Sequence, residues 1–416
     1  MAFKIEVLDK LMGSGKTTTI LQWCEDNPTT PFLYVTPLLS ESEGRVVNAC
    51  VQSKFIAPNT EEFDTKGEHL LDLLQSGVNI SITHALYSSL KDPHLFWIKQ
   101  NNYTLILDEE VSFIEPLNAG YTKSDFDYLK DLNQIRVEED GRLVWLNEDI
   151  KDGAKYSKLS NMCRLGMIYQ AKRSDSMFVT QLPIGLIHSA QRVIVLTYLF
   201  KGSIMSSFLK LKGIEVVDFT EIKLNEQSKV NLIPLIEFVG DKQVKEWAGE
   251  SLSSTWYTKA TQKDLTDIGK SIRAIGDANK VKNTELVWCV PSTLVNPTRS
   301  GARKVAPRGY SAGSGEIDED GIAQGCFLAC TARATNAYRD RSVLVHAYNR
   351  FPHVSVSSFL QDYGVDVDNN QFALSELVQF VWRSQIRDGK PIKICILSKR
   401  MRSLFQNWLT QEENSK

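Results

Sequence analysis

A glycine-rich loop near the amino terminus constrains this chain more than any other feature. Residues 12–18 read Met-Gly-Ser-Gly-Lys-Thr-Thr, between an apolar run at 5–8 and a helix-like stretch at 19–23. A strand, a glycine loop and a helix in this order are the context of a phosphate-binding loop. The glycines let successive backbone N–H groups point toward phosphate oxygens at a helix N-terminus. The sequence therefore predicts a nucleotide-binding α/β fold, and an ordinary glycine turn is the less favoured interpretation.

The loop also supplies side chains for a nucleotide and its metal ion. Lys16 is expected to reach the β and γ phosphates of ATP, and the Thr17 hydroxyl is expected to bind Mg²⁺. The full pattern G-x-x-x-x-G-K-[ST] would place glycine at position 10, where this chain has Lys10, and the loop resembles the helicase-type form x-x-x-G-x-G-K-T instead. The candidate phosphate-binding residues are Gly13, Ser14, Gly15, Lys16, Thr17 and Thr18.

An acidic pair follows an apolar strand-like run about 90 residues downstream. Residues 105–110 read Leu-Ile-Leu-Asp-Glu-Glu. A strand that ends in Asp108 places a carboxylate at the C-terminal edge of a parallel sheet, where it can hold Mg²⁺ beside the loop. Glu109 is suited to polarise an attacking water as a general base. An exposed acidic turn is the alternative, and the upstream loop makes the paired site the favoured interpretation.

Composition bounds the class of protein. Of the 416 residues, 42% are hydrophobic and 24% charged, which is typical of a globular domain protein. The net charge of −2 implies that any nucleic-acid site is a local basic groove. No apolar run approaches the length of a membrane span, and the first strand leaves no room for a signal peptide, so we expect no membrane association and a cytoplasmic protein.

The seven cysteines are scattered and form no C-x-x-C pair. Buried free thiols in a reducing cytoplasm are the favoured interpretation. Cys326 and Cys330, with His346, are only a weak candidate for a metal site.

The alternation of apolar runs and helical stretches predicts two α/β series. In the first, strands are expected at 32–36, 79–83, 103–108 and 192–197. The second begins near residue 225, with strands expected at 229–233, 285–290, 325–330, 342–347 and 393–397, a helix at 262–278, a mobile loop at 297–320 and a polar tail at 411–416.

A long interval at about 113–185 separates two strands of the first series and is interpreted as an insertion. Residues 134–138 and 142–146 flank Glu-Asp-Gly, which predicts a β-hairpin, and the rest of the interval is expected to be helical. Its later half is basic, which indicates either nucleic-acid contact or a solvated helical face. These basic residues are Lys155, Lys158, Arg164, Lys172 and Arg173.

With these motifs the chain resembles a superfamily 2 helicase-type ATPase. Residues 13–17 resemble motif I, and 108–111 are similar to the DExx box. Residues 34–37 lie where motif Ia would be, near a DNA backbone path, and 83–86 resemble the short threonine motif before motif II. Thr197 is the one residue of motif III that survives.

The C-terminal half carries a second part of the resemblance. Residues 379–387 resemble motif VI, with Gln379 and Arg383 in register and Arg387 one residue late. On a helix the two arginines would share a face and could act as arginine fingers. Residues 332–341 and 382–389 are similar to segments of small phage-encoded DEAD-like helicases.

The resemblance implies two tandem RecA-like domains with parallel sheets, at 1–224 and 225–416, with the insertion in the first. It implies an ATP- and Mg²⁺-dependent helicase or translocase, on DNA rather than RNA, in phage-type replication, recombination or repair, with replication or recombination proteins as possible partners and the bacterial host cytoplasm as its location. Trp145, Trp288 and Tyr338 could stack on bases, although each is more typical of a core aromatic.

Three alternatives stay open at this point. A thymidine-kinase-like phosphotransferase has a similar loop, but would be about half this length and usually carries zinc-binding C-x-x-C pairs. A packaging-type ATPase would carry a carboxylate-rich nuclease domain at its C-terminus. The third is a nucleotide-gated nucleic-acid-binding or loader module without motor activity, which the intact Asp108–Glu109 pair disfavours.

Overall fold

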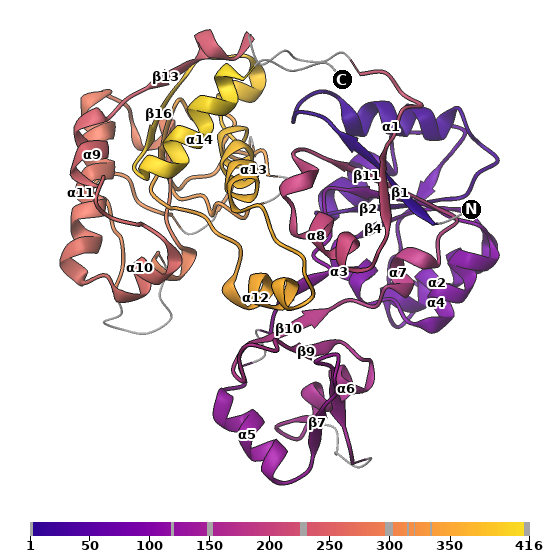
Figure 1. Cartoon of the computed structure of the whole chain (residues 1–416). Coiled ribbons are helices and arrows are strands. Elements are labelled where there is room, and N and C mark those ends of the chain that lie inside the picture. The colour runs from indigo at the N-terminus through magenta and orange to yellow at the C-terminus, as the bar shows by residue number, and fades with distance from the viewer. Residues whose placement is uncertain are drawn as a thin grey trace. The chain divides into compact units, whose positions relative to one another are not determined.

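The computed structural model describes most of the chain (Figure 1): residues 3–117, 120–147, 153–224, 231–295, 303–313, 316–319, 321–332 and 335–411. The chain forms two compact units. The first comprises Met1–Lys10, Gly15–Leu224 and Pro352–Asp368, and the second Leu11–Ser14, Asn225–Phe351 and Asn369–Lys416. Each unit is an α/β domain built on a parallel sheet, as the sequence predicts.

A seven-stranded parallel sheet forms the centre of the first unit. The expected strands at 32–36, 79–83 and 192–197 are confirmed, and the one expected at 103–108 begins one residue later. The strands at 32–36, 104–108 and 192–197 are largely apolar because both faces of the sheet are buried there, whereas the edge strand at 215–218 reads Glu-Val-Val-Asp and is mostly exposed. In spatial order the seven strands are β12 (Glu215–Asp218), β1 (Lys4–Asp9), β11 (Arg192–Thr197), β5 (Thr104–Asp108), β2 (Phe32–Thr36), β4 (Asn79–Thr83) and β3 (Phe55–Ile56).

Two hydrophobic clusters cover opposite faces of this sheet. Alternate residues of β2 show the division, since Leu33 and Val35 belong to one cluster and Phe32 and Tyr34 to the other. The helical segments of the first unit, apart from the insertion and α12, are α1 (Lys16–Glu25), η1 (Glu41–Val46), α2 (Lys66–Ser76), α3 (His84–Ser88), α4 (Asp92–Gln100), α7 (Gly185–His188), η2 (Phe200–Gly202) and α8 (Ile204–Leu211).

The insertion has a small core of its own. The predicted hairpin is confirmed, with Ile135 opposite Trp145. The expectation that the remainder is helical is only partly right, because β6, β10 and β9 form an antiparallel sheet too short to show a period in the sequence. Phe126 and Phe178 stack at 3.8 Å in this core. The elements are β6 (Ile114–Pro116), α5 (Lys123–Asp131), β7 (Ile135–Val137), β8 (Leu143–Trp145), α6 (Ser157–Arg164), β9 (Ile168–Gln170) and β10 (Phe178–Gln181).

One helix of the first unit comes from far along the chain. Helix α12 (Val354–Asp362) contributes Phe359 and Leu360 to the core that contains Leu33. The side chain of Asp362 is only 1% exposed and pairs with Arg173 at 2.9 Å, and it also accepts the backbone N–H of Lys172. The 352–368 segment thus ties the insertion to the main sheet of this unit.

The second unit has a four-stranded parallel sheet, β13 (Ile236–Phe238), β16 (Ile392–Ile396), β15 (Val343–His346) and β14 (Leu286–Cys289) in spatial order. The predicted helix at 262–278 is confirmed as α11. The other helical segments are η4 (Ile233–Leu235), α9 (Asp241–Glu246), α10 (Ser254–Lys259), η5 (Asn283–Glu285), η6 (Ser292–Leu294), α13 (Asn369–Val381), η7 (Gln385–Asp388) and α14 (Lys399–Thr410).

Two strands expected in this half are displaced or missing. The run at 229–233 is not a strand where it is described, since a 3₁₀ turn containing Pro234 follows and the strand begins at Ile236. The run at 325–330 forms only a bridge between Phe327 and Trp288. Part of the expected loop at 297–320 and most of the tail at 411–416 lie outside the described residues.

Candidate nucleotide site

The glycine-rich loop links the end of β1 to the start of α1. Gly13 and Gly15 have φ values of 78° and 83°, a left-handed backbone that glycine adopts without strain. Gly15 is the N-cap of α1, and no described side chain caps this helix end. The first backbone N–H groups of α1 therefore remain suited to an anionic ligand.

The loop and the acidic strand end meet in one hydrogen bond. The Thr17 hydroxyl donates to Oδ2 of Asp108 at 3.0 Å, although the two residues are 91 positions apart. Strands β1 and β5 flank β11 in the sheet and run parallel, so their C-terminal ends lie at one edge. This juxtaposition is the one that the sequence predicts for an Mg²⁺ and phosphate site.

Lys16 lies at the start of α1, and its amine donates to the backbone carbonyl of Lys10. Burial lowers the pKa of Lys16 to about 8, and the opposing attraction of Asp108, Asp9 and Glu109 does not overcome it. An anionic ligand such as a phosphate, placed beside this amine, would favour the charged form of Lys16.

Burial also dominates the charge state of Asp108. It raises the pKa of this carboxyl to about 6, against hydrogen bonds from Tyr34 and Thr17 that lower it. The neighbouring Glu109 adds to the increase and Lys16 opposes it. A divalent cation would relieve this unfavourable charge burial, which fits a metal-binding role.

The two glutamates after Asp108 are held differently. Glu109 has φ 69°, a conformation that costs a non-glycine residue roughly 1–3 kcal/mol, and its N–H donates to the carbonyl of Leu196 at 3.0 Å. Glu110 accepts a hydrogen bond of 2.8 Å from Thr197, which ties the predicted third motif to the acidic box. Strained backbone of this kind clusters at functional sites.

Two further side chains touch Asp108, and sequence reasoning assigned neither of them to it. Tyr34 donates to Oδ2 at 2.8 Å, and a ring nitrogen of His84 lies 3.1 Å from the backbone carbonyl. Both follow from position, because β2 and β4 end at the same sheet edge as β5. The segments at 34–37 and 83–86 are predicted to be motifs, but their sequences do not show that Tyr34 and His84 contact Asp108.

The remaining loop residues are less constrained. Thr18 is exposed and accepts a hydrogen bond of 3.2 Å from Arg45. The N–H of Ser14 donates to the Leu11 carbonyl at 3.3 Å within the loop.

The predicted arginine pair of the second unit does not share a helical face. Helix α13 ends at Val381, so the expectation of one continuous helix through both arginines is wrong. Arg383 is buried in the turn that follows, whereas Arg387 is exposed in η7 and donates to the Asn336 side chain. The side chain of Ser384 accepts the Ile386 N–H and begins this new turn. Gln379 is half-buried on α13 and donates to Ser375 at 3.3 Å.

The aromatic candidates for base stacking are mostly core residues. Trp145 and Trp288 are buried, and the indole of Trp288 donates to the Tyr310 carbonyl at 3.0 Å. Tyr338 is half-buried, and its hydroxyl donates to the Phe327 carbonyl at 2.6 Å. Of the segment at 332–341, which contains Tyr338, residues 333 and 334 lie outside the described part of the chain.

A cavity of about 710 Å³ opens in the second unit where β14 and β15 end. It carries two guanidinium groups and many hydroxyls, and no carboxylate is among its lining residues. Arg350 is held by Glu376 at 2.9 Å, and Arg303 donates to the Thr258 carbonyl at 2.8 Å. Its polar lining comprises Ser254, Tyr257, Thr258, Ser292, Thr293, Arg303, Thr331, Tyr348 and Arg350. Sequence reasoning missed this site, although Pro-Ser-Thr directly after a buried strand was a signal.

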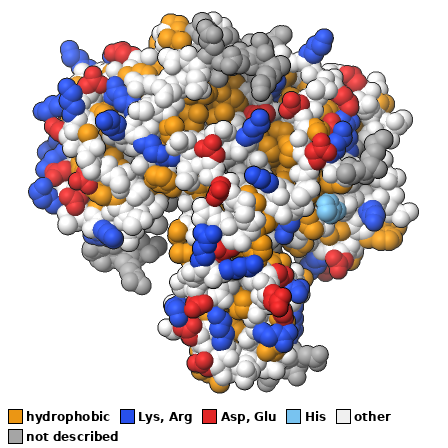
Figure 2. All heavy atoms as spheres, in the orientation of Figure 1, with side chains coloured by type: hydrophobic (Ala, Val, Ile, Leu, Met, Phe, Trp, Pro, Cys, Tyr) orange, Lys and Arg blue, Asp and Glu red, His pale blue; other side chains and the backbone are white. Residues whose placement is uncertain are grey.

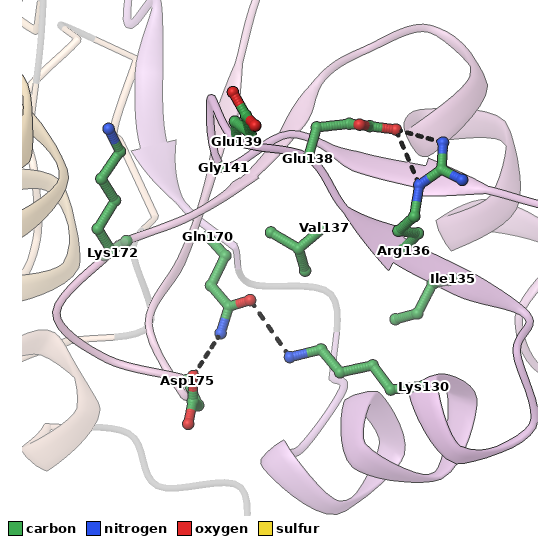
Figure 3. A pocket seen from close by; sticks show the side chains of 11 residues that line it. Lys130, Ile135, Arg136, Val137, Glu138, Glu139, Gly141, Gln170, Lys172 and Asp175 are labelled. Carbon is green, nitrogen blue, oxygen red and sulfur yellow. Dashed lines mark hydrogen bonds and ion pairs between the residues drawn. The ribbon is translucent and has the colours of Figure 1, made fainter.

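A second cavity, of about 550 Å³, lies in the insertion and contains none of the loop residues (Figure 3). Gln170 sits between Lys130 and Asp175 there, at 3.2 and 3.4 Å. On the insertion, at the bottom of Figure 2, acidic and basic side chains are interspersed over the surface that faces the viewer. Of the basic residues for which nucleic-acid contact and a solvated face were both open, Lys155 pairs with Asp125 at 2.6 Å and Arg173 with Asp362. These ion pairs give the two side chains partners within the protein, which disfavours nucleic-acid contact for them.

The cysteines form no disulfide and no metal site in the described part of the chain. All seven cysteines are free and buried. Cys326 donates to the Asn283 carbonyl, and His346 is buried in the second sheet. Within the described ranges, no group of three or more His, Cys, Asp or Glu side chains is arranged to hold a metal ion. None of the described helices has the length and apolar character to cross a bilayer.

Comparison with known proteins gives two similarities. Residues 225–409 match the family model described as the YonV C-terminal Rossmann-like domain. The whole chain is similar to the SPbeta prophage-derived uncharacterized protein YonV of Bacillus subtilis (strain 168), with 29% identity over 425 residues, covering 98% of this chain and 99% of that protein. The chain is therefore similar along its full length to a prophage-derived protein, and its C-terminal half resembles a Rossmann-like domain.

Proposed function

We propose that this protein is an ATP- and Mg²⁺-dependent nucleic-acid helicase or translocase of the superfamily 2 type, acting on DNA in phage replication, recombination or repair. The observation that carries the proposal is the 3.0 Å hydrogen bond between Thr17 and Asp108 beside Lys16. Similarity to a prophage-derived protein supports the phage context.

Each residue of the site has a role in this proposal. The loop N–H groups and Lys16 hold the phosphates, while Thr17 and Asp108 hold Mg²⁺, which neutralises phosphate charge. Glu109 orients and deprotonates the attacking water. Arg383 and Arg387 are the candidates for stabilising transition-state charge, and the exposed Arg387 is the better placed of the two to reach a ligand.

The cavity at the ends of β14 and β15 supports the nucleic-acid part of the proposal. Proteins that bind nucleic acid without base specificity contact mainly its backbone phosphates, through Arg, Lys, hydroxyl and backbone N–H groups. Two arginines and several hydroxyls without a lining carboxylate match that chemistry. A nucleotide-gated loader would use the same residues, and only turnover distinguishes it from a motor.

Steady-state ATP hydrolysis, with and without single-stranded DNA, duplex DNA and RNA, tests the proposal. Stimulation by one nucleic acid, weakening steeply with salt, supports a motor and identifies its track. Nucleotide binding without turnover would indicate the loader. A basal rate of ATP hydrolysis that none of the three nucleic acids changes would contradict the translocase proposal and favour small-molecule phosphotransfer.

A further inference from the structure

Tyr34 makes an unexpected contact with the predicted metal ligand. Its ring is fully buried on β2, and its hydroxyl donates to Oδ2 of Asp108 at 2.8 Å. The Thr17 hydroxyl donates to the same oxygen at 3.0 Å. Two donors from two different elements therefore converge on one carboxylate oxygen.

The sheet register explains how Tyr34 reaches this position. Tyr34 lies opposite Ile106 in the parallel pair of β2 and β5, two residues before Asp108. Side chains two apart on a strand share a face and are about 6–7 Å apart along it, a span that a phenol leaning along the strand covers. Phe55 packs edge-on against the ring at 6.0 Å and helps to fix its direction.

We propose that Tyr34 is a positioning residue for the Mg²⁺ site, an inference that rests on the proposed nucleotide-dependent function. Two hydroxyls that hold Oδ2 restrict the rotation of the carboxylate, so Oδ1 would keep one orientation for binding a cation. Partners that orient a metal-binding carboxylate typically matter 10–100-fold for metal affinity. In this role Tyr34 acts through Asp108.

The competing explanation is that Tyr34 is an ordinary core residue, which bonds to Asp108 only because a buried hydroxyl needs a hydrogen-bond partner. The same unit offers a matched control, because Tyr87 on helix α3 is equally buried and donates to the Leu186 backbone carbonyl at 2.8 Å. Tyr34→Phe and Tyr87→Phe each remove one buried hydroxyl and keep the ring. A structural role predicts the same consequences for both variants, and a positioning role does not.

The test is binding of a non-hydrolysable ATP analogue to the full chain by titration calorimetry, at a series of free Mg²⁺ concentrations and in EDTA. We expect Tyr34→Phe to raise the Mg²⁺ concentration for half-maximal binding about 10-fold. Binding in EDTA should be unchanged, and Tyr87→Phe should match wild type. The thermal midpoint in EDTA, measured for each variant, reports any loss of folding.

A double variant keeps the proposal testable even if Tyr34→Phe is less stable. In an Asp108→Asn background, adding Tyr34→Phe should cause no further change in Mg²⁺ dependence, since the affected ligand is already gone. Equal Mg²⁺ dependence of Tyr34→Phe, Tyr87→Phe and wild type would overturn the positioning role while leaving the nucleotide site intact. A wild-type protein that binds no analogue at all would instead overturn the proposed function and, with it, this role.

Discussion

The nucleotide edge of the first unit and the arginine segment of the second show opposite relations between sequence distance and geometry. Thr17 and Asp108 are 91 residues apart and share a hydrogen bond. Arg383 and Arg387 are four residues apart, yet one is buried after a helix end and the other is exposed in a 3₁₀ turn. A parallel sheet brings strand ends together regardless of separation, whereas a helical face exists only while the helix continues.

The largest effect on turnover is expected from Arg387, which lies in η7 and not on one continuous helix with Arg383. If the exposed Arg387 stabilises transition-state charge, Arg387→Ala should reduce turnover on the order of 10³-fold with an unchanged thermal midpoint. Arg383→Ala should lower the thermal midpoint, because this side chain is buried. Steady-state kinetics and thermal unfolding of both variants measure this. Arg136→Ala, also exposed and paired at 2.7 Å with Glu138, is the control, and wild-type turnover in Arg387→Ala would remove Arg387 from the site.

Glu109→Gln tests the sheet-edge side of the comparison. Loss of a general base should reduce turnover about 10²-fold or more while nucleotide binding persists, because the backbone and the metal ligands remain. Single-turnover hydrolysis and analogue binding separate the two effects. Glu110→Gln is the neighbouring control, since Glu110 is bonded to Thr197. Retained turnover in Glu109→Gln would assign the base to another residue.

Stability against pH probes the buried carboxylate at the same edge. The pKa of Asp108 in the folded chain, about 6, lies above its unfolded value, so burial of its charge lowers the free energy of unfolding. This loss of stability is absent below about pH 4 and complete above pH 6. In EDTA, Asp108→Asn should therefore be more stable than wild type by about 3 kcal/mol at pH 8, with the difference vanishing near pH 4. Urea unfolding at both values measures this. A variant less stable than wild type at pH 8 would contradict the charge-burial explanation.

The smallest effect concerns a contact across 190 residues that does not involve strand ends. Asp362→Ala removes the acceptor of the Lys172 N–H and the partner of Arg173. We expect a loss of about 1 kcal/mol in unfolding free energy, with faster amide hydrogen exchange at residues 172 and 173. Asp366→Ala, an exposed carboxylate in the same segment, is the control. Unchanged exchange would show that Asp362 does not hold residues 172 and 173 of the insertion.

The same contrast explains how far the sequence could go. Long buried runs and the glycine loop predicted most of the main strands and the loop–Asp108 pair, because sheet topology leaves few alternatives. The short strands at 114–116 and 168–170 carry no usable period, and Pro234 moved a strand start. Tyr34 and His84 could not be assigned to Asp108, since their contacts depend on strand order. The hydroxyl and arginine cavity likewise depends on β14 and β15 being neighbours.

Helix α12 also sets an order of events during protein synthesis. The first unit needs Phe359 and Leu360 to complete its core, yet about 140 residues separate Leu224 from the end of this segment. At roughly 5–20 residues per second, a ribosome needs about 7–30 s to supply them. Throughout that interval the apolar surface that receives α12 faces water on the nascent chain. The N-terminal unit can thus complete its core only after the ribosome has translated α12.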